Sequence, residues 1–149
     1  MADGDGWTRC ARGHRHWGVY GAAGLLLVAD GRVLLQHRAP WSHHGDTWGI
    51  PGGARARAET ADQAALREAG EEAGLRAGDV RVLDRVVDDH GGWAYTTVVA
   101  TADRPLDVQP LDGESLALEW VPVEAVSGRL LHPGFASSWP GHLEQLRAG

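Results

Sequence analysis

The sequence has no lysine, only one cysteine, and no apolar segment long enough to cross a bilayer. With Cys10 alone, the chain cannot form an internal disulfide, which favours a reducing cytoplasm. The N-terminus also lacks the basic and apolar regions of a secretory signal peptide. All 14 basic residues are arginine, and the net charge of −6 argues against binding to polymeric nucleic acid. A small anionic substrate bound through a metal ion remains compatible with this charge, whereas a membrane is not an expected partner.

The 149 residues suit one compact domain, and 43% apolar with 23% charged residues are typical of a globular protein. Residues 1–16 show no periodicity and are predicted to be a flexible lead-in, followed by a single domain over 17–149. The apolar patterns predict strands at 20–28, 33–36, 80–87, 93–100 and 115–121, helices at 59–73 and from about 140, and a helical turn at 123–126. Strands and helices alternate without repeats or a linker, which predicts an α/β fold.

The predicted helix 59–73 contains a group of acidic residues with a helical spacing. Glu68, Glu71 and Glu72 lie at positions i, i+3 and i+4, so their side chains share one face of the helix. Carboxylates gathered in this way repel one another by roughly 0.2–0.5 kcal/mol per pair, and they are oxygen ligands of the kind that suits Mg²⁺ or Mn²⁺. A solvated acidic face is the simpler interpretation of such spacing taken alone.

The residues around these acids favour a metal site. Gly53 precedes Glu59 by six positions, and the run Arg67-Glu68-Ala69-Gly70-Glu71-Glu72-Ala73-Gly74-Leu75 follows. The pattern resembles the Nudix box, G-x5-E-x7-R-E-U-x-E-E-x-G-U, in which U is a bulky aliphatic residue. Ala69 is small at the first U position, a departure that affects packing beneath the helix rather than its acidic face. The resemblance implies an α/β/α Nudix sandwich with a mixed sheet and a divalent-cation-dependent hydrolase.

The Nudix resemblance also assigns roles to individual residues. It implies that Mg²⁺, or Mn²⁺, is bound by the three glutamates together with the carbonyl oxygen of Gly52. Gly52 and Gly53 end a strand and allow the backbone to approach the metal closely. Arg67 is not expected to reach the acidic face readily; we expect it to pair with Glu59 and orient the loop, a structural role for both residues and for Gly53.

Beyond the box, four segments resemble the MutT branch of the Nudix superfamily: 17–27, 33–45, 48–53 and 131–135. The resemblance implies that Arg38 contacts substrate phosphates, for which a guanidinium is a good bidentate ligand, although a surface arginine is an equally good interpretation. Glu114 lies where MutT-like members carry a further metal-binding or base glutamate, with Glu119 as the competing candidate.

The segment 130–135 aligns with the base-recognition loop of MutT. His132 is its polar side chain, and Phe135 could stack on a purine, although a single aromatic residue beside a C-terminal helix is more often part of the core. The eight histidines raise the possibility of zinc, but His14/His16 and His43/His44 lack the spacing of a structural zinc site, and no cysteine cluster accompanies them.

The leading hypothesis is a pyrophosphohydrolase of nucleoside di- or triphosphates, in which water attacks phosphorus in line while Mg²⁺ neutralises charge. The MutT resemblance favours oxidised purine nucleotides such as 8-oxo-dGTP or 8-oxo-dGDP, with the monophosphate as product. The alternatives are a hydrolase of a nucleotide sugar, ADP-ribose or another specialised diphosphate, and a non-catalytic Nudix-like ligand sensor. The sequence leaves open whether the chain is a monomer or a homodimer.

Overall fold

The computed structural model describes residues 3–113 and 115–148. Its centre is a seven-stranded sheet with the order β5-β4-β3-β8-β7, in which β6 also pairs with β3 and β9 with β4. The strands of this sheet are β3 (Ala22–Ala29), β4 (Arg32–Arg38), β5 (Trp48–Gly49), β6 (Gly52–Ala54), β7 (Arg81–Asp89), β8 (Ala94–Thr101) and β9 (Ser115–Pro122). Because β3 and β8 are parallel while the other pairs are antiparallel, the sheet is mixed.

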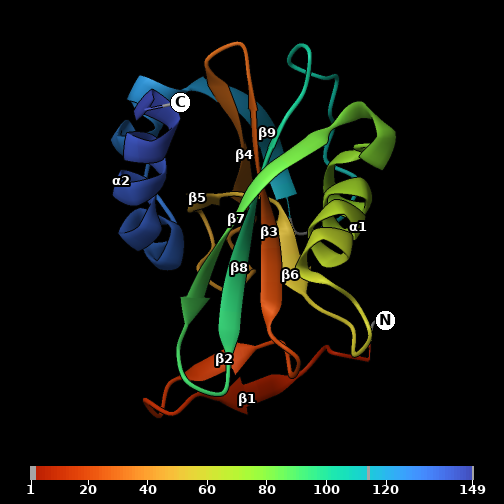
Figure 1. Ribbon diagram of the computed structural model, residues 1–149, viewed down its shortest axis with the longest axis vertical. Coiled ribbons are helices and arrows are strands. Elements are labelled where there is room, and N and C mark those ends of the chain that lie inside the picture. The colour runs from red at the N-terminus through yellow and green to blue at the C-terminus, as the bar shows by residue number, and fades with distance from the viewer. Residues whose placement is uncertain (1–2, 114, 149) are drawn as a thin grey trace.

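One long helix covers each face of the sheet (Figure 1), α1 (Ala61–Ala73) on one side and α2 (Pro133–Ala148) on the other. Successive side chains of β3 point to opposite faces. Leu25 and Leu27 therefore pack with α1, while Leu26 packs with α2, and all three are fully buried. The predicted α/β class and α/β/α sandwich are confirmed.

The structure corrects the prediction that residues 1–16 are a flexible lead-in. Two short strands, β1 (Trp7–Arg9) and β2 (Arg15–Trp17), form an antiparallel hairpin within the described part of this segment. The hairpin lies across one end of the sheet (Figure 1), and the rings of Trp7 and Trp17 meet edge to face with centroids 5.2 Å apart. Three residues per strand are too few for an alternating pattern to be visible in the sequence.

The C-terminal helix begins earlier than the predicted start near residue 140. It starts at Pro133, and Pro140 lies inside it. A proline is well tolerated in the first turn of a helix, where its missing N–H costs nothing.

Two short 3₁₀ helices, η1 (Ala77–Asp79) and η2 (Val123–Gly128), complete the fold. Among the described residues, neither α-helix has both the length and the apolar character of a bilayer-spanning segment.

Candidate active site

The acidic residues of the motif lie on α1, whose two ends are well defined. Thr60 caps the N-terminus: its side chain accepts a hydrogen bond from the Gln63 N–H, and the Gln63 side chain accepts one from the Thr60 N–H. Gly74 ends the helix in the left-handed conformation, with φ at 74°, which glycine adopts without steric cost. These two caps fix the helical register of the acidic face.

Glu72 is the most deeply placed of the three glutamates, with 7% of its surface exposed. Its Oε2 accepts a hydrogen bond from the backbone N–H of Gly52 at 3.1 Å. Burial raises the pKa of this carboxyl well above its usual range, and the nearby charges of Glu68 and Asp112 raise it further. Burying the ionised Glu72 carboxylate costs free energy, and a hydrogen bond from one backbone N–H does not remove this cost. A cation bound at this position would offset it.

Glu68 and Glu71 differ in their surroundings. The Glu68 side chain is only 15% exposed, and burial raises its pKa, while its hydrogen bond from Arg67 acts in the opposite direction. Glu71 is 59% exposed and lies 3.4 Å from Nη1 of Arg67. Among the described residues, the ligand oxygens of the three glutamates do not all lie within 4.8 Å of one another.

Strand β6 brings its backbone against this acidic face. A Cβ atom on Gly53 would lie 2.7 Å from the carboxyl carbon of Glu68, and one on Gly52 would lie 2.5 Å from the carbonyl oxygen of Ala23. Any larger residue at either position would therefore displace a carboxylate or the sheet. These close contacts explain physically why two consecutive glycines precede the acidic helix.

Arg67 and Glu59 form the ion pair that the sequence predicts. Nε and Nη2 of Arg67 donate to the two carboxylate oxygens of Glu59 at 2.7 and 2.9 Å, and Nη2 also donates to the Ala54 carbonyl at 2.9 Å. The pKa of Glu59 is lowered, chiefly by this hydrogen bonding. The prediction that Arg67 does not readily reach the acidic face is wrong, because its Nη1 donates to Glu68 at 2.9 Å. Arg67 therefore ties the loop after β6 to the acidic helix.

Arg38 and His132 come from distant parts of the sequence and lie near each other. The Nε of Arg38 donates to the His43 carbonyl at 3.0 Å. Burial lowers the pKa of His132 to about 4, with the Arg38 charge as the next contribution. The same guanidinium charge lowers the pKa of Glu72, although burial dominates there. The charge of Arg38 therefore acts on both His132 and Glu72.

Phe135 and Glu114 are the other two site residues predicted from the sequence. Phe135 lies in α2 with 7% of its surface exposed, and its ring packs against Trp139 with centroids 5.6 Å apart. This placement in the core corrects the prediction that Phe135 stacks on a purine, since its ring faces other apolar side chains. Glu114 lies outside the described residues, and Glu119, its competitor, is ion-paired with Arg129.

Two residues near the site had no recognisable sequence signal. Asp112 raises the pKa of Glu72 and accepts a hydrogen bond from the Ser115 hydroxyl at 2.9 Å. The pKa of the Tyr95 hydroxyl is raised by burial and then by the charge of Glu72. A Cβ on Gly24 would lie 2.0 Å from that hydroxyl. The contact across the parallel β3–β8 pair explains why Gly24 occupies the middle of a buried strand.

The donor set fits a hard divalent cation. Its carboxylates are oxygen ligands on one helical face, and the buried Glu72 carboxylate has acidic neighbours and one backbone N–H donor. Mg²⁺ and Mn²⁺ favour oxygen ligands and retain positions for water and phosphate. The acidic face of α1 is therefore suited to bind a divalent cation.

Comparisons with known proteins find relatives that match most of the chain. The NUDIX domain model matches residues 19–141. A Mycobacterium tuberculosis protein named "Putative 8-oxo-dGTP diphosphatase 3" is 53% identical over 148 residues, which cover 92% of this chain and 68% of that protein. A Bifidobacterium longum protein named "Nucleoside triphosphate pyrophosphatase/Nudix hydrolase fusion protein" is 45% identical over 152 residues, covering 96% of this chain and 32% of that protein.

A solved structure is similar over nearly the whole chain. The crystal structure of the Nudix hydrolase RenU from M. smegmatis superimposes with a TM-score of 0.87 at 50% identity, covering 97% of this chain and 96% of that chain. The similarity therefore extends beyond the motif to the hairpin, the sheet and both helices.

Proposed function

This chain belongs to the Nudix family and is a hydrolase of that family, and from this premise we propose that it cleaves the diphosphate linkage of nucleoside di- and triphosphates. Oxidised purine nucleotides such as 8-oxo-dGTP and 8-oxo-dGDP are its proposed substrates, the nucleoside monophosphate its product, and the cytoplasm its place of action. The observation that carries the proposal is the acidic face of α1, with the buried Glu72 carboxylate hydrogen-bonded to Gly52.

Glu68, Glu71, Glu72 and the Gly52 carbonyl are the proposed ligands of Mg²⁺, or of Mn²⁺ in its place. When bound, the cation neutralises charge on the phosphate oxygens and the leaving group. The chain supplies the positioning. The N–H of Gly52 holds the Glu72 carboxylate, and Arg67 holds Glu68 against the loop after β6. These contacts orient the ligand oxygens before substrate arrives.

Arg38 and His132 are the proposed substrate contacts. The guanidinium of Arg38 is suited to bidentate contact with phosphate oxygens. A pKa of about 4 keeps His132 neutral at physiological pH, and its Nδ1 accepts the Gly134 N–H at 3.1 Å. The proton of the neutral ring is therefore on Nε2, which leaves an N–H donor for an acceptor atom of the nucleotide. The name of the M. tuberculosis relative supports an oxidised guanine nucleotide as substrate.

Substrate preference is tested by measuring kcat/KM for 8-oxo-dGTP, 8-oxo-dGDP and their unmodified counterparts with Mg²⁺. We expect the oxidised nucleotides to be preferred by at least about tenfold, since each hydrogen bond to the altered base edge discriminates by roughly 1–3 kcal/mol. His132→Ala should reduce that preference more than it reduces turnover of dGTP. A ratio near one, with ADP-ribose or a nucleotide sugar hydrolysed faster, would contradict the proposed substrate class.

The close contact between Gly53 and Glu68 gives a second test. Gly53→Ala is expected to lower kcat about tenfold or more, because the added methyl group would displace the Glu68 carboxylate. Stability should change little, since the group that must move is the end of a flexible side chain. Gly78→Ala is the matched control, because a Cβ there meets nothing within 4 Å. Unchanged kinetics in Gly53→Ala would remove Glu68 from the proposed ligands.

A further inference from the structure

The β1–β2 hairpin is attached to the turn that joins β7 and β8. The N–H of Ala11 donates to the Gly91 carbonyl at 2.6 Å, and the indole N–H of Trp93 donates to the Gly18 carbonyl at 2.9 Å. The His16 ring stacks on Trp93, with centroids 3.9 Å apart and planes 7° from parallel. Residues separated by more than seventy positions in the sequence therefore meet at this end of the sheet.

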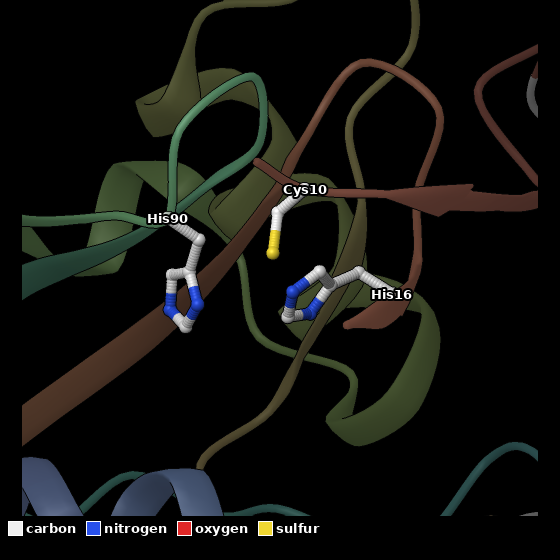
Figure 2. Close-up of side chains that lie close together, drawn as sticks. All are labelled: Cys10, His16 and His90. Atoms are coloured by element: carbon white, nitrogen blue, oxygen red, sulfur yellow. The ribbon is translucent and has the colours of Figure 1, made fainter. Parts of the chain in front are cut away.

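Three metal-binding side chains converge at this junction (Figure 2). Cys10, His16 and His90 each offer a ligand atom, and these atoms all lie within 4.8 Å of one another. The Cys10 sulfur is directed at the gap between the two imidazole rings. A tetrahedral zinc site has Zn–N distances of about 2.0–2.1 Å and Zn–S distances of about 2.3 Å, so its ligand atoms lie roughly 3.3–3.7 Å apart. Small side-chain rotations would bring the three ligand atoms from their present separations to those of a tetrahedral zinc site.

The nitrogen atoms facing this junction have no hydrogen-bonding partner among the described residues. They are Nε2 of His16 and Nδ1 of His90, and both are buried. A buried polar atom left without a hydrogen-bonding partner destabilises the fold, and native structures seldom leave two of them side by side.

His90 has the supporting contact that metal-bound histidines usually have. Its Nε2 lies 2.8 Å from Oδ2 of Asp88, so Nε2 carries the proton and donates to the carboxylate. The proton is thereby fixed away from Nδ1, whose lone pair faces Cys10 and His16. Carboxylate–histidine–metal arrangements of this kind orient the ring and increase its basicity.

We propose that Cys10, His16 and His90 bind a Zn²⁺ ion, with water as the fourth ligand. Thiolate and imidazole ligands suit Zn²⁺ and disfavour Mg²⁺, which needs oxygen ligands, so this site differs in chemistry from the glutamate cluster. On binding, the Cys10 thiol loses its proton to solvent and a sulfur–zinc bond forms, without any redox change. The ion would link the hairpin to the β7–β8 turn. Sequence spacing gave no indication of it, because the third ligand lies far from the first two.

The single cysteine makes the proposal testable by absorption spectroscopy. Chelator-treated, reduced protein without an affinity tag is titrated with Co²⁺, which substitutes for Zn²⁺ and gives a thiolate-to-metal charge-transfer band. Since Cys10 is the only cysteine, any such band reports on this site. We expect a band that saturates at one equivalent, disappears when Zn²⁺ is added, and is absent in Cys10→Ser. Zn²⁺ should also raise the melting temperature of the wild type and not that of Cys10→Ser.

Matched variants separate this site from the acidic one. His16→Ala and His90→Ala should each abolish the saturating band, while His44→Ala, at an exposed histidine outside the cluster, should keep it. Asp88→Asn is expected to weaken Zn²⁺ binding by about 10–100-fold. Glu72→Gln should leave the band unchanged. The proposal is overturned if Co²⁺ gives no thiolate band with folded wild-type protein, or if the band persists in both His16→Ala and His90→Ala.

Discussion

Glu72→Gln is expected to lower kcat at least about a hundredfold at saturating Mg²⁺ while the fold survives. Glutamine keeps the side-chain volume and can still accept a hydrogen bond from Gly52, but it removes the negative charge that would bind the cation. Steady-state kinetics across a range of Mg²⁺ concentrations measure the effect. Glu144→Gln, at an exposed position on α2, is the matched control and should behave as wild type. Near-normal turnover in Glu72→Gln would remove Glu72 from the metal site.

The same variant should not lose stability. Folding raises the pKa of Glu72 because the carboxyl is buried. The ionised form therefore opposes folding at pH 7, and this penalty vanishes below the ordinary glutamate pKa of about 4.3. In metal-free buffer at pH 7, thermal melts should place the Tm of Glu72→Gln at or above that of wild type. A strongly lowered Tm would show that Glu72 supports the fold rather than the chemistry.

Arg67→Ala is expected to have the largest effect on stability, a loss of about 2–3 kcal/mol. This value lies between the 3–5 kcal/mol typical of breaking a buried pair and the 0–1 kcal/mol of an exposed pair, because the Arg67 and Glu59 side chains are 29% and 17% exposed. Removal of the guanidinium leaves Glu59 and Glu68 without their main cationic partner. Chemical denaturation of the metal-free protein measures the loss.

Two further variants define the origin of that loss. Arg67→Lys keeps the charge but not the two parallel hydrogen bonds to Glu59, so it should recover only part of the stability. Arg85→Ala removes an exposed ion pair with Asp62 and should leave the denaturation midpoint unchanged. An Arg67→Ala midpoint equal to that of wild type would show that the ion pair with Glu59 does not stabilise the fold.

The sequence predicted the sheet and the acidic helix because their patterns are local. The continuous apolar run of β3, the alternation predicted for β8, and the spacing of Glu68, Glu71 and Glu72 are visible within single segments. The predicted helix starts near Pro140, whereas α2 starts at Pro133, and a proline is favourable at the first position of a helix in either case.

Contacts between distant segments could not be inferred in this way. The sequence allows Phe135 to stack on a substrate, and only its packing against Trp139 in the folded chain shows that it belongs to the core. The meeting of Cys10 and His16 with His90 depends on how a short hairpin sits against a turn, and no local pattern encodes that arrangement. Asp112 influences Glu72 only because the loop before β9 folds over the end of α1, where the Leu111 N–H donates to the Glu72 carbonyl at 3.0 Å.

Cation-dependent hydrolysis at the acidic face is tested by analysing the products of 8-oxo-dGTP and 8-oxo-dGDP after incubation with the wild type and with Glu72→Gln, each with Mg²⁺ and with excess chelator. We expect nucleoside monophosphate from the wild type with Mg²⁺, at least about a hundredfold less from Glu72→Gln, and none with chelator. Equal hydrolysis in both proteins, or hydrolysis that persists without any divalent cation, would contradict cation-dependent hydrolysis at this face.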